Sequence, residues 1–431
     1  MTRKILRGRV LTFVDEPQAF DDHASYKFFE DGAVTIENGR IVHAGDFDVG
    51  AAVGTEVVDH RPFLIMPGLI DTHVHYVQSQ IVGAYAGSLL EWLNRHTFFE
   101  EQKFGQQGHA EAIASRFFDE LIRNGTTTVA AYCSVHKQSA DAFFAEAERR
   151  NLLVVGGKVM MDRNAPEALC DTAQSSYDDT EALIRQWHGR GRGHYAITPR
   201  FAITSTPAQL EAARALTGAF PECHVQTHLS ENHDEIKLSK SLYPDSADYA
   251  GIYEDYGLLG PKTLLAHCIH LTHREAGALA ETGAVAVFCP TSNLFLGSGL
   301  FDRQRLHQTG VRIGVATDIG GGTSYSMLRT MDEGYKVLQL RGERLSPLAS
   351  FYMITLGNAR ALGFEDRVGS LAAGRDADLV VLDSAATPAM ALRRATVETL
   401  SDELFLLQTL GDDRSVREVY VAGEPAKSRL P

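Results

Sequence analysis

The chain has few of the features that mark secreted, membrane or nucleic-acid-binding proteins. Its five cysteines are scattered over 431 residues and form no Cys-x-x-Cys pair, which argues against a disulfide framework and a cysteine-based zinc site. No hydrophobic run is long enough to cross a bilayer, and the net charge of -14 comes without a basic cluster. We therefore expect neither a membrane nor a nucleic acid as partner.

Residues 1–9 are charged, and they lead into an alternating strand pattern instead of the apolar core of a signal peptide. Together with the cysteine usage, this pattern predicts a cytoplasmic location. The sequence also lacks solenoid-length repeats, low-complexity tracts and heptads. Because 44% of this long chain is apolar, we expect one large domain and a smaller one.

Apolar runs bounded by turn residues alternate with helical patterns through the middle of the chain. A helix is expected from Ala110 to Arg123, where apolar residues recur at helical spacing ahead of Asn124-Gly125. Eight strands with eight crossovers predict an α/β fold, a (β/α)8 barrel of the TIM type. The predicted strands are 64–75, 126–133, 152–160, 194–201, 224–231, 263–270, 285–293 and 312–320.

Short alternating strands are predicted near both chain ends instead. We expect these strands to combine into one small β-sandwich domain, made of residues 1–65 and 370–431, beside a barrel of residues 66–369. The predicted strands are Ile5–Phe13, Ala33–Glu37, Arg40–Ala44, Ala377–Asp383 and Val416–Ala422.

The first barrel strand ends in two histidines two residues apart, His73 and His75, which must share one face of the strand. Chemistry in such barrels takes place at the C-terminal ends of the strands, so the other strand ends can be examined for partners. Asp71, His228, Glu231, His267 and Asp318 all lie at such ends. This convergence of imidazoles and carboxylates predicts a site for a divalent transition metal such as zinc.

Structural alternatives exist for each of these residues. A single histidine on a strand is more often a hydrogen-bonded core residue, and we assign that role to His136, His224, His270 and His273. Asp318 could instead cap the turn before Gly320, and Glu231 could cap the helix that follows it.

The residues also resemble a known family. Asp71-x-His-x-His, a strand-five histidine, a strand-six histidine and a strand-eight aspartate match the amidohydrolase superfamily, and the closer resemblance is to its guanine deaminases. Matching segments include His73-Val-His-Tyr-Val-Gln78, Leu89-Leu-Glu-Trp-Leu-Asn94, Pro199-Arg-Phe201, His228-Leu-Ser-Glu-Asn232 and Leu410-Gly-Asp-Asp-Arg414, of which Leu-Glu-Trp-Leu, Pro-Arg-Phe and His-x-Ser-Glu-Asn together are the most specific. They extend from the first barrel strand almost to the end of the chain.

The resemblance implies a metal-dependent hydrolase with assigned residue roles. Asp318 would accept a proton from the attacking water, His267 would orient that water, and Glu231 would protonate the purine ring nitrogen beside the attacked carbon. One Zn²⁺ per chain, with iron as the alternative metal, would be held by His73, His75, His228 and Asp318. A second metal commonly needs a lysine at the end of strand four, and 194–201 has none; Lys158 lies on strand three.

The resemblance further implies free guanine as the substrate, converted to xanthine and ammonia. Arg200 would donate to O6 and N7 of the base, Gln78 would contact another edge, and Phe201 would complete the pocket. Trp92 and Phe98 would stack on the base, with ordinary helix packing as an equal alternative. The other functions left open are action on 8-oxoguanine, pterins or triazines, or a non-catalytic scaffold. Relatives of this kind are usually homodimers.

Overall fold

The strands of the computed structural model form two sheets, one of nine strands and one of seven. The structure describes residues 3–85 and 89–431. Residues 1–2 of the predicted terminal domain, and residues 86–88 ahead of the Leu89–Asn94 segment, lie outside the described part.

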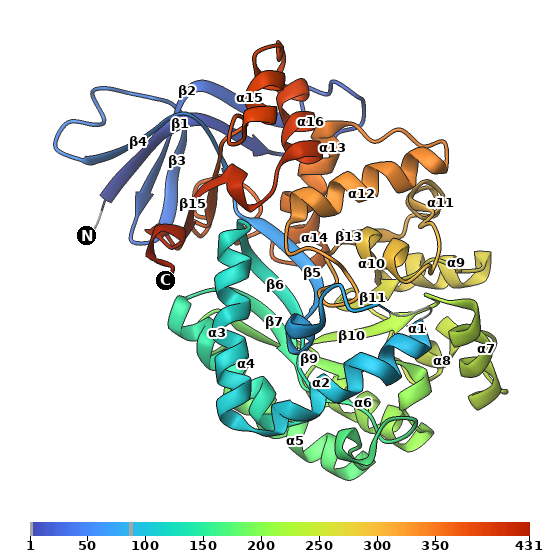
Figure 1. Ribbon diagram of the computed structural model, residues 1–431. Helices are drawn as coiled ribbons and strands as arrows, with labels where there is room; N and C mark the ends of the chain where they lie inside the picture. The colour runs from blue at the N-terminus through green and yellow to red at the C-terminus, as the bar shows by residue number, and fades with distance from the viewer. Residues whose placement is uncertain (1–2, 86–88) are drawn as a thin grey trace.

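The nine-stranded sheet contains the predicted barrel, with eight parallel strands that pair in chain order (Figure 1). A short strand, β8 (Val159–Met160), pairs with β9 beside this path. The fold class predicted for the middle of the chain is confirmed. The barrel strands are β5 (Leu69–His75), β6 (Thr126–Tyr132), β7 (Leu153–Gly157), β9 (Gly193–Pro199), β10 (His224–Leu229), β11 (Thr263–His267), β12 (Val285–Phe288) and β13 (Arg312–Val315).

Side chains connect the first barrel strand to the last. The amide of Asn358 donates to the carbonyls of Ile70 in β5 (2.6 Å) and Val315 in β13 (2.8 Å), and it accepts from the backbone N–H of Val315. The hydroxyl of Thr72 also donates to Val315 O at 3.0 Å. These bonds satisfy backbone groups that would otherwise be buried without a partner where the two strands meet.

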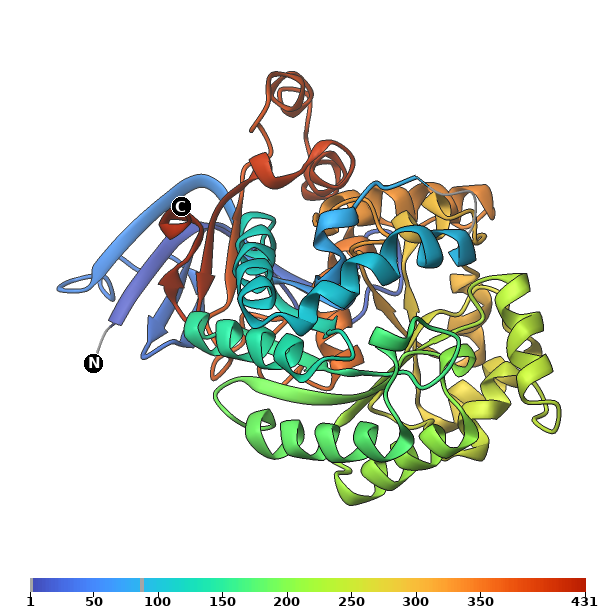
Figure 2. The same cartoon turned by 60° about the horizontal axis from the view of Figure 1, so that its bottom comes forward.

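Helices between the strands cover the outside of the barrel (Figures 1 and 2). The predicted helix is present as α3, Gln107–Arg123; it buries its apolar stripe and ends ahead of Gly125, whose φ is +86°. The other helices of the barrel region are α4 (Lys137–Arg150), α5 (Ala173–Trp187), α6 (Pro207–Ala219), α7 (His233–Leu242), α8 (Tyr249–Asp255), α9 (His273–Thr282), α10 (Pro290–Phe295), α11 (Arg303–Thr309), α12 (Met327–Leu340), α13 (Pro347–Tyr352) and α14 (Asn358–Leu362).

A broken helical segment follows β5 on the side of the strand ends. It comprises α1 (Leu89–Trp92), a π-helical turn (Leu93–Thr97) and α2 (Phe98–Glu101). Trp92, Phe98 and Phe201 belong to one apolar cluster there, which brings this segment beside the end of β9.

The chain ends contribute β structure as predicted, in the form of one mixed sheet in the order β16-β15-β14-β4-β1-β2-β3. Figures 1 and 2 show the blue N-terminal strands next to the red C-terminal ones. The predicted domain boundaries stay a prediction. The strands are β1 (Arg3–Phe13), β2 (Tyr26–Glu37), β3 (Arg40–Asp46), β4 (Glu56–Pro67), β14 (Leu379–Leu382), β15 (Val416–Val421) and β16 (Glu424–Pro425).

Several segments differ from the sequence prediction; the predicted strand 285–293, for example, ends at Phe288 and is followed by the helix α10. The predicted strand 64–75 is divided between the sheets, because Leu64–Pro67 pair with β14 while the barrel strand begins at Leu69. The stretch between β14 and β15 contains the helices α15 (Pro388–Arg394) and α16 (Leu400–Leu410). Thr387 and Thr399 cap these helices, and Leu404 and Leu407 on α16 are buried.

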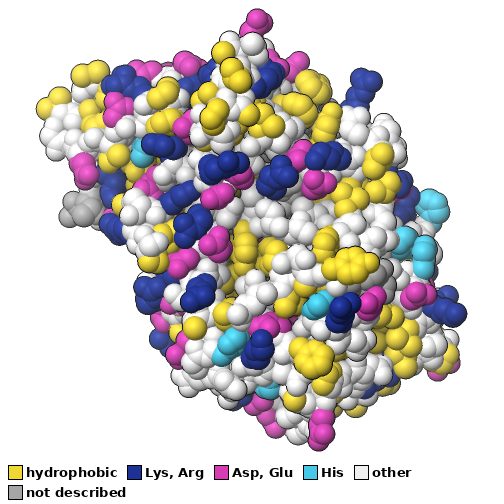
Figure 3. Space-filling model, in the orientation of Figure 1, with side chains coloured by type: hydrophobic (Ala, Val, Ile, Leu, Met, Phe, Trp, Pro, Cys, Tyr) yellow, Lys and Arg dark blue, Asp and Glu magenta, His cyan; other side chains and the backbone are white. Residues whose placement is uncertain are grey.

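The distribution of charge on the surface agrees with a sequence that has no basic cluster. Acidic and basic side chains are interspersed on the face shown in Figure 3. No helix in the described ranges has the length and apolarity needed to span a membrane. All five cysteines are free.

Candidate active site

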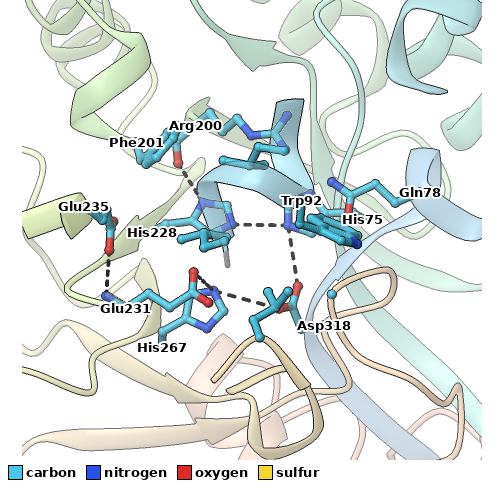
Figure 4. A pocket seen from close by; sticks show the side chains of 14 residues that line it. His75, Gln78, Trp92, Arg200, Phe201, His228, Glu231, Glu235, His267 and Asp318 are labelled. Carbon is cyan, nitrogen blue, oxygen red and sulfur yellow. Dashed lines mark hydrogen bonds and ion pairs between the residues drawn. The ribbon is translucent and has the colours of Figure 1, made fainter. Parts of the chain in front are cut away.

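The side chains predicted to meet at the strand ends do lie together, and Figure 4 shows His75, His228, Glu231, His267 and Asp318 around one pocket. His73 and His75 come from β5, His228 from β10, His267 from the end of β11, and Asp318 from the segment after β13. Three or more of these residues at a time bring ligand atoms within 4.8 Å of one another. Parallel strands make this possible because all their C-terminal ends open on the same side of the barrel.

The spacing of the ligand atoms suits a tetrahedral metal. Nε2 of His73 lies 3.2 Å from Asp318 Oδ1, Nε2 of His75 lies 3.6 Å from the same oxygen, and Nε2 of His75 lies 3.2 Å from Nε2 of His228. Ligands roughly 2.0–2.1 Å from a tetrahedral zinc stand about 3.3–3.4 Å apart. Two buried ring nitrogens, His73 Nε2 and His75 Nδ1, have no hydrogen-bond partner among the described residues. These residues fit a metal.

The imidazoles are held in the neutral form that binds metals. Burial lowers the pKa of His73 and, with the neighbouring histidines, holds those of His75 and His228 well below the usual value. Nδ1 of His228 is 2.7 Å from the carbonyl of Arg200, so this nitrogen donates and Nε2 keeps its lone pair. Burial alone would raise the pKa of Asp318, but the nearby His73 and His267 outweigh that effect and lower it.

Asp71, on the same strand as the two histidines, has a structural role. Its carboxylate accepts hydrogen bonds from the hydroxyl and the backbone N–H of Thr317 and from the backbone N–H of His73. Asp71 thereby connects the end of β5 to the residue before Asp318 and holds two sides of the ligand cluster in place.

Glu231 and His267 form a pair beside the cluster. Glu231 Oε2 lies 3.3 Å from His267 Nε2, and the hydroxyl of Ser298 donates to Glu231 Oε1 at 2.7 Å. Nδ1 of His267 is 2.9 Å from Asn293 Oδ1, which orients the ring. Burial raises the pKa of Glu231. Burial opposes the charge of His267, yet Glu231 and Asp318 raise its pKa above the usual value.

The loop that carries Glu231 is fixed by a second glutamate. Glu235 Oε2 accepts from the backbone N–H of Glu231 (2.8 Å) and of Asn232 (3.0 Å), and Tyr249 donates its hydroxyl to Oε1. Asn232 in turn caps α7. Glu231 therefore precedes the capping residue, and its side chain lines the pocket instead of capping the helix.

The predicted substrate-binding residues line one pocket with the ligand cluster. Gln78, Trp92, Arg200 and Phe201 are buried, and all four border it (Figure 4). The ring of Phe201 lies edge-on, 6.1 Å from that of His228. Phe98 packs in the adjoining apolar cluster, with the guanidinium of Arg200 5.9 Å from its ring.

The residues of the pocket region that the sequence analysis missed include Tyr132, Glu101 and Glu235. Tyr132 ends β6, and its ring lies 4.6–5.0 Å from those of His73, His75 and His228. A survey of all strand ends, not only of metal-binding residue types, would have found it. Glu101 accepts from Gln78 and Arg200, and no sequence pattern indicates this contact.

Lys158 is not among the residues that line the pocket. Its buried ammonium group forms an ion pair with Asp171 and donates to the carbonyl of Val159. The histidines assigned to the core behave in the expected way at two positions, where His224 contacts Leu362 O and His270 contacts Ser298 O.

Comparison with known proteins agrees with this geometry. The model of the amidohydrolase family matches residues 64–426. The chain belongs to the amidohydrolase family. Guanine deaminase of Escherichia coli is 46% identical to this amidohydrolase over 98% of the chain and 97% of the relative.

Solved structures of guanine deaminases match this chain over nearly its full length. The structure of E. coli guanine deaminase has a TM-score of 0.95 and 45% identity, and covers 98% of this chain and 99% of that one. A guanine deaminase from C. acetobutylicum, with guanine bound in its active site, has a TM-score of 0.88 and 30% identity over 98% of this chain and 100% of that one.

Proposed function

We propose that this amidohydrolase hydrolyses free guanine to xanthine and ammonia. The observation that carries the proposal is the pocket in which a metal-type ligand cluster, the buried acid Glu231 and the guanidinium of Arg200 meet. The similarity to guanine deaminases over nearly the full chain supports the same substrate. In the C. acetobutylicum relative, guanine occupies the active site.

The ligand set we propose is His73, His75, His228 and Asp318, holding one Zn²⁺ per chain, with iron as the alternative metal. When bound, the metal supplies a Lewis acid that makes a water molecule acidic near neutral pH. Asp318 would accept a proton from the attacking water at a carboxylate oxygen and would later return a proton to the departing ammonia. His267, fixed by Asn293, orients the water and stabilises charge on the adduct.

Glu231 has the role of proton donor to the ring nitrogen beside C2. Burial raises its pKa, so a larger fraction of the carboxyl groups is protonated near neutral pH than in an exposed glutamate. Protonation makes C2 a better electrophile, water adds there, and the C–N bond to the exocyclic amine breaks as ammonia leaves. Its contacts with Ser298 and His267 hold both carboxylate oxygens at the pocket wall.

Recognition of the base rests on Arg200, Gln78 and Phe201. The guanidinium offers donors to O6 and N7, whereas the amino group of adenine would face it donor to donor. Phe201 and Trp92 supply apolar surface for the ring. A homodimeric state and a cytoplasmic location remain predictions from the resemblance and the composition.

One experiment tests the proposal directly. Purified protein is mixed with guanine, 8-oxoguanine, adenine, cytosine, a pterin or melamine, and ammonia release is measured. We expect guanine to give the highest kcat/KM by at least about tenfold, since a site built to pair polar groups rejects bases that leave them unpaired. Preference for a pterin or a triazine would reassign the substrate, and no turnover of any compound by the zinc-loaded protein would favour a scaffold.

A further inference from the structure

Glu101 lies at the end of α2, fully buried between the two residues assigned to base recognition. Its Oε2 accepts from Nη1 of Arg200 at 2.5 Å, and its Oε1 accepts from Nε2 of Gln78 at 2.8 Å. Arg200 and Gln78 extend toward one another in Figure 4. One carboxylate, contributed by a helix outside the barrel, therefore joins a residue after β9 to a residue after β5.

The contact between Glu101 and Arg200 neutralises the positive charge of the guanidinium and fixes its orientation. Arg200 is 3% exposed, and a buried cation without a partner is strongly unfavourable. Pairing with Glu101 balances the charge of the guanidinium, which suits the binding of an uncharged purine. It also engages Nη1 and leaves the remaining N–H donors for a ligand, since the structure gives Arg200 no other side-chain acceptor in the ranges it describes.

The contact between Glu101 and Gln78 fixes the orientation of the Gln78 side-chain amide. Nε2 donates to Glu101, while Oε1 accepts from the backbone N–H of Gly320 at 3.4 Å. A flipped amide would place its NH2 group against another donor and its oxygen against a carboxylate, which is unfavourable at a buried site. The donor and acceptor pattern that Gln78 presents is thus set by Glu101.

We propose that Glu101 is a positioning residue that sets the base specificity of the pocket, by holding Arg200 and Gln78 in the orientation that matches guanine. This inference rests on the proposed function, because it assigns those two side chains to the base. Glu101 acts through them and does not touch the reacting atoms.

The test compares Glu101→Gln with Glu101→Asp and a control on the same helix. Glutamine has one acceptor oxygen where two donors need one each, so kcat/KM for guanine should fall about 30- to 300-fold, mainly through KM. For 2-aminopurine, which lacks O6, the fall should be less than about fivefold. Aspartate keeps both acceptors and the charge, and should recover about tenfold of the loss.

The control is Glu100→Gln. Glu100 is 6% exposed and pairs with Lys103 at 2.6 Å, without contact to Arg200 or Gln78 in the described structure. It should change kcat/KM by no more than about threefold for either base. Zinc content should match the parent in all three variants.

The outcomes separate the inference from the proposed function. A parent protein that does not release ammonia from guanine refutes the function, and with it this inference. An active parent whose E101Q variant loses guanine and 2-aminopurine equally, or keeps its specificity, refutes the inference alone. If E101Q does not fold, the same comparison is made with E101D, whose remaining loss for guanine, about 3- to 30-fold, should exceed its loss for 2-aminopurine; equal losses for the two bases overturn the inference.

Discussion

Replacing Glu231 by glutamine removes one proton from the site and little else. Glu231 is 2% exposed and holds its place through Ser298 and His267. Glutamine has the same length, and its oxygen can still accept from Ser298. The ligand atoms of the proposed metal site belong to other side chains, so metal binding should be retained. What the variant lacks is the ability to donate a proton to the ring nitrogen.

The expected loss of kcat follows from the rate enhancement that a positioned proton donor typically provides. General acid catalysis contributes typically about 10²- to 10⁴-fold, which corresponds to roughly 3–5 kcal/mol of barrier. Because burial raises the pKa of Glu231, more of the carboxyl groups are protonated near neutral pH than in an exposed glutamate. We therefore expect kcat to fall by about two to four orders of magnitude, while KM changes less than about fivefold because the pocket shape is unchanged.

The assay measures ammonia release with guanine, alongside zinc content by elemental analysis. Ser298→Ala is the matched control, because it removes the hydrogen bond to Oε1 but leaves the acid, and it should cost no more than about tenfold. A Glu231→Gln variant with normal zinc and near-normal turnover would show that the ring is protonated from elsewhere. Loss of zinc together with activity would show that Glu231 supports the metal instead.

Three further predictions concern base recognition by Arg200, the proposed metal site and the buried Glu235. Arg200→Ala should lower kcat/KM for guanine by roughly 2–4 kcal/mol in transition-state terms and that for 2-aminopurine much less, so equal losses in paired kinetic runs would contradict base recognition. Chelation should abolish turnover, and about one Zn²⁺ per chain should restore it; elemental analysis finding two tightly held metals would contradict the single site. Burial raises the folded-state pKa of Glu235 from 4.5 to about 7, so its stabilising contribution is complete below pH 4.5 and is lost as pH rises through about 7. The melting temperature of the parent should therefore fall more between pH 5 and 8 than that of Glu235→Gln, and identical slopes would refute this linkage.

The sequence was sufficient to predict which side chains meet where the alternation of side chains along a strand and the parallel arrangement of the barrel strands place them together. Alternation along a strand places His73 and His75 on one face, and the parallel arrangement brings His228, His267 and Asp318 to the same end of the barrel. Such rules depend only on spacing along the chain and on the fold class. They predict which residues gather, without specifying the partners that fix each one.

Contacts between separate elements could not be predicted in this way. Glu101 and Arg200 are 99 positions apart and meet because the segment after β5 folds back over the end of β9. Asn293 likewise acquires its neighbour His267 only in three dimensions. The terminal region shows the same limit, since the helices α15 and α16 lie between strands of a sheet whose pairing is long-range.

The pairing of β4 has a consequence for synthesis on the ribosome. This strand lies between β1, from the first residues, and β14, which begins at Leu379. During translation, one edge of β4 therefore stays unpaired until β14 has been synthesised, which requires more than 300 further residues. A nascent chain stalled after the barrel would thus expose a sheet edge open to wrong pairing, and it should depend on chaperones that bind such edges more than the released chain does.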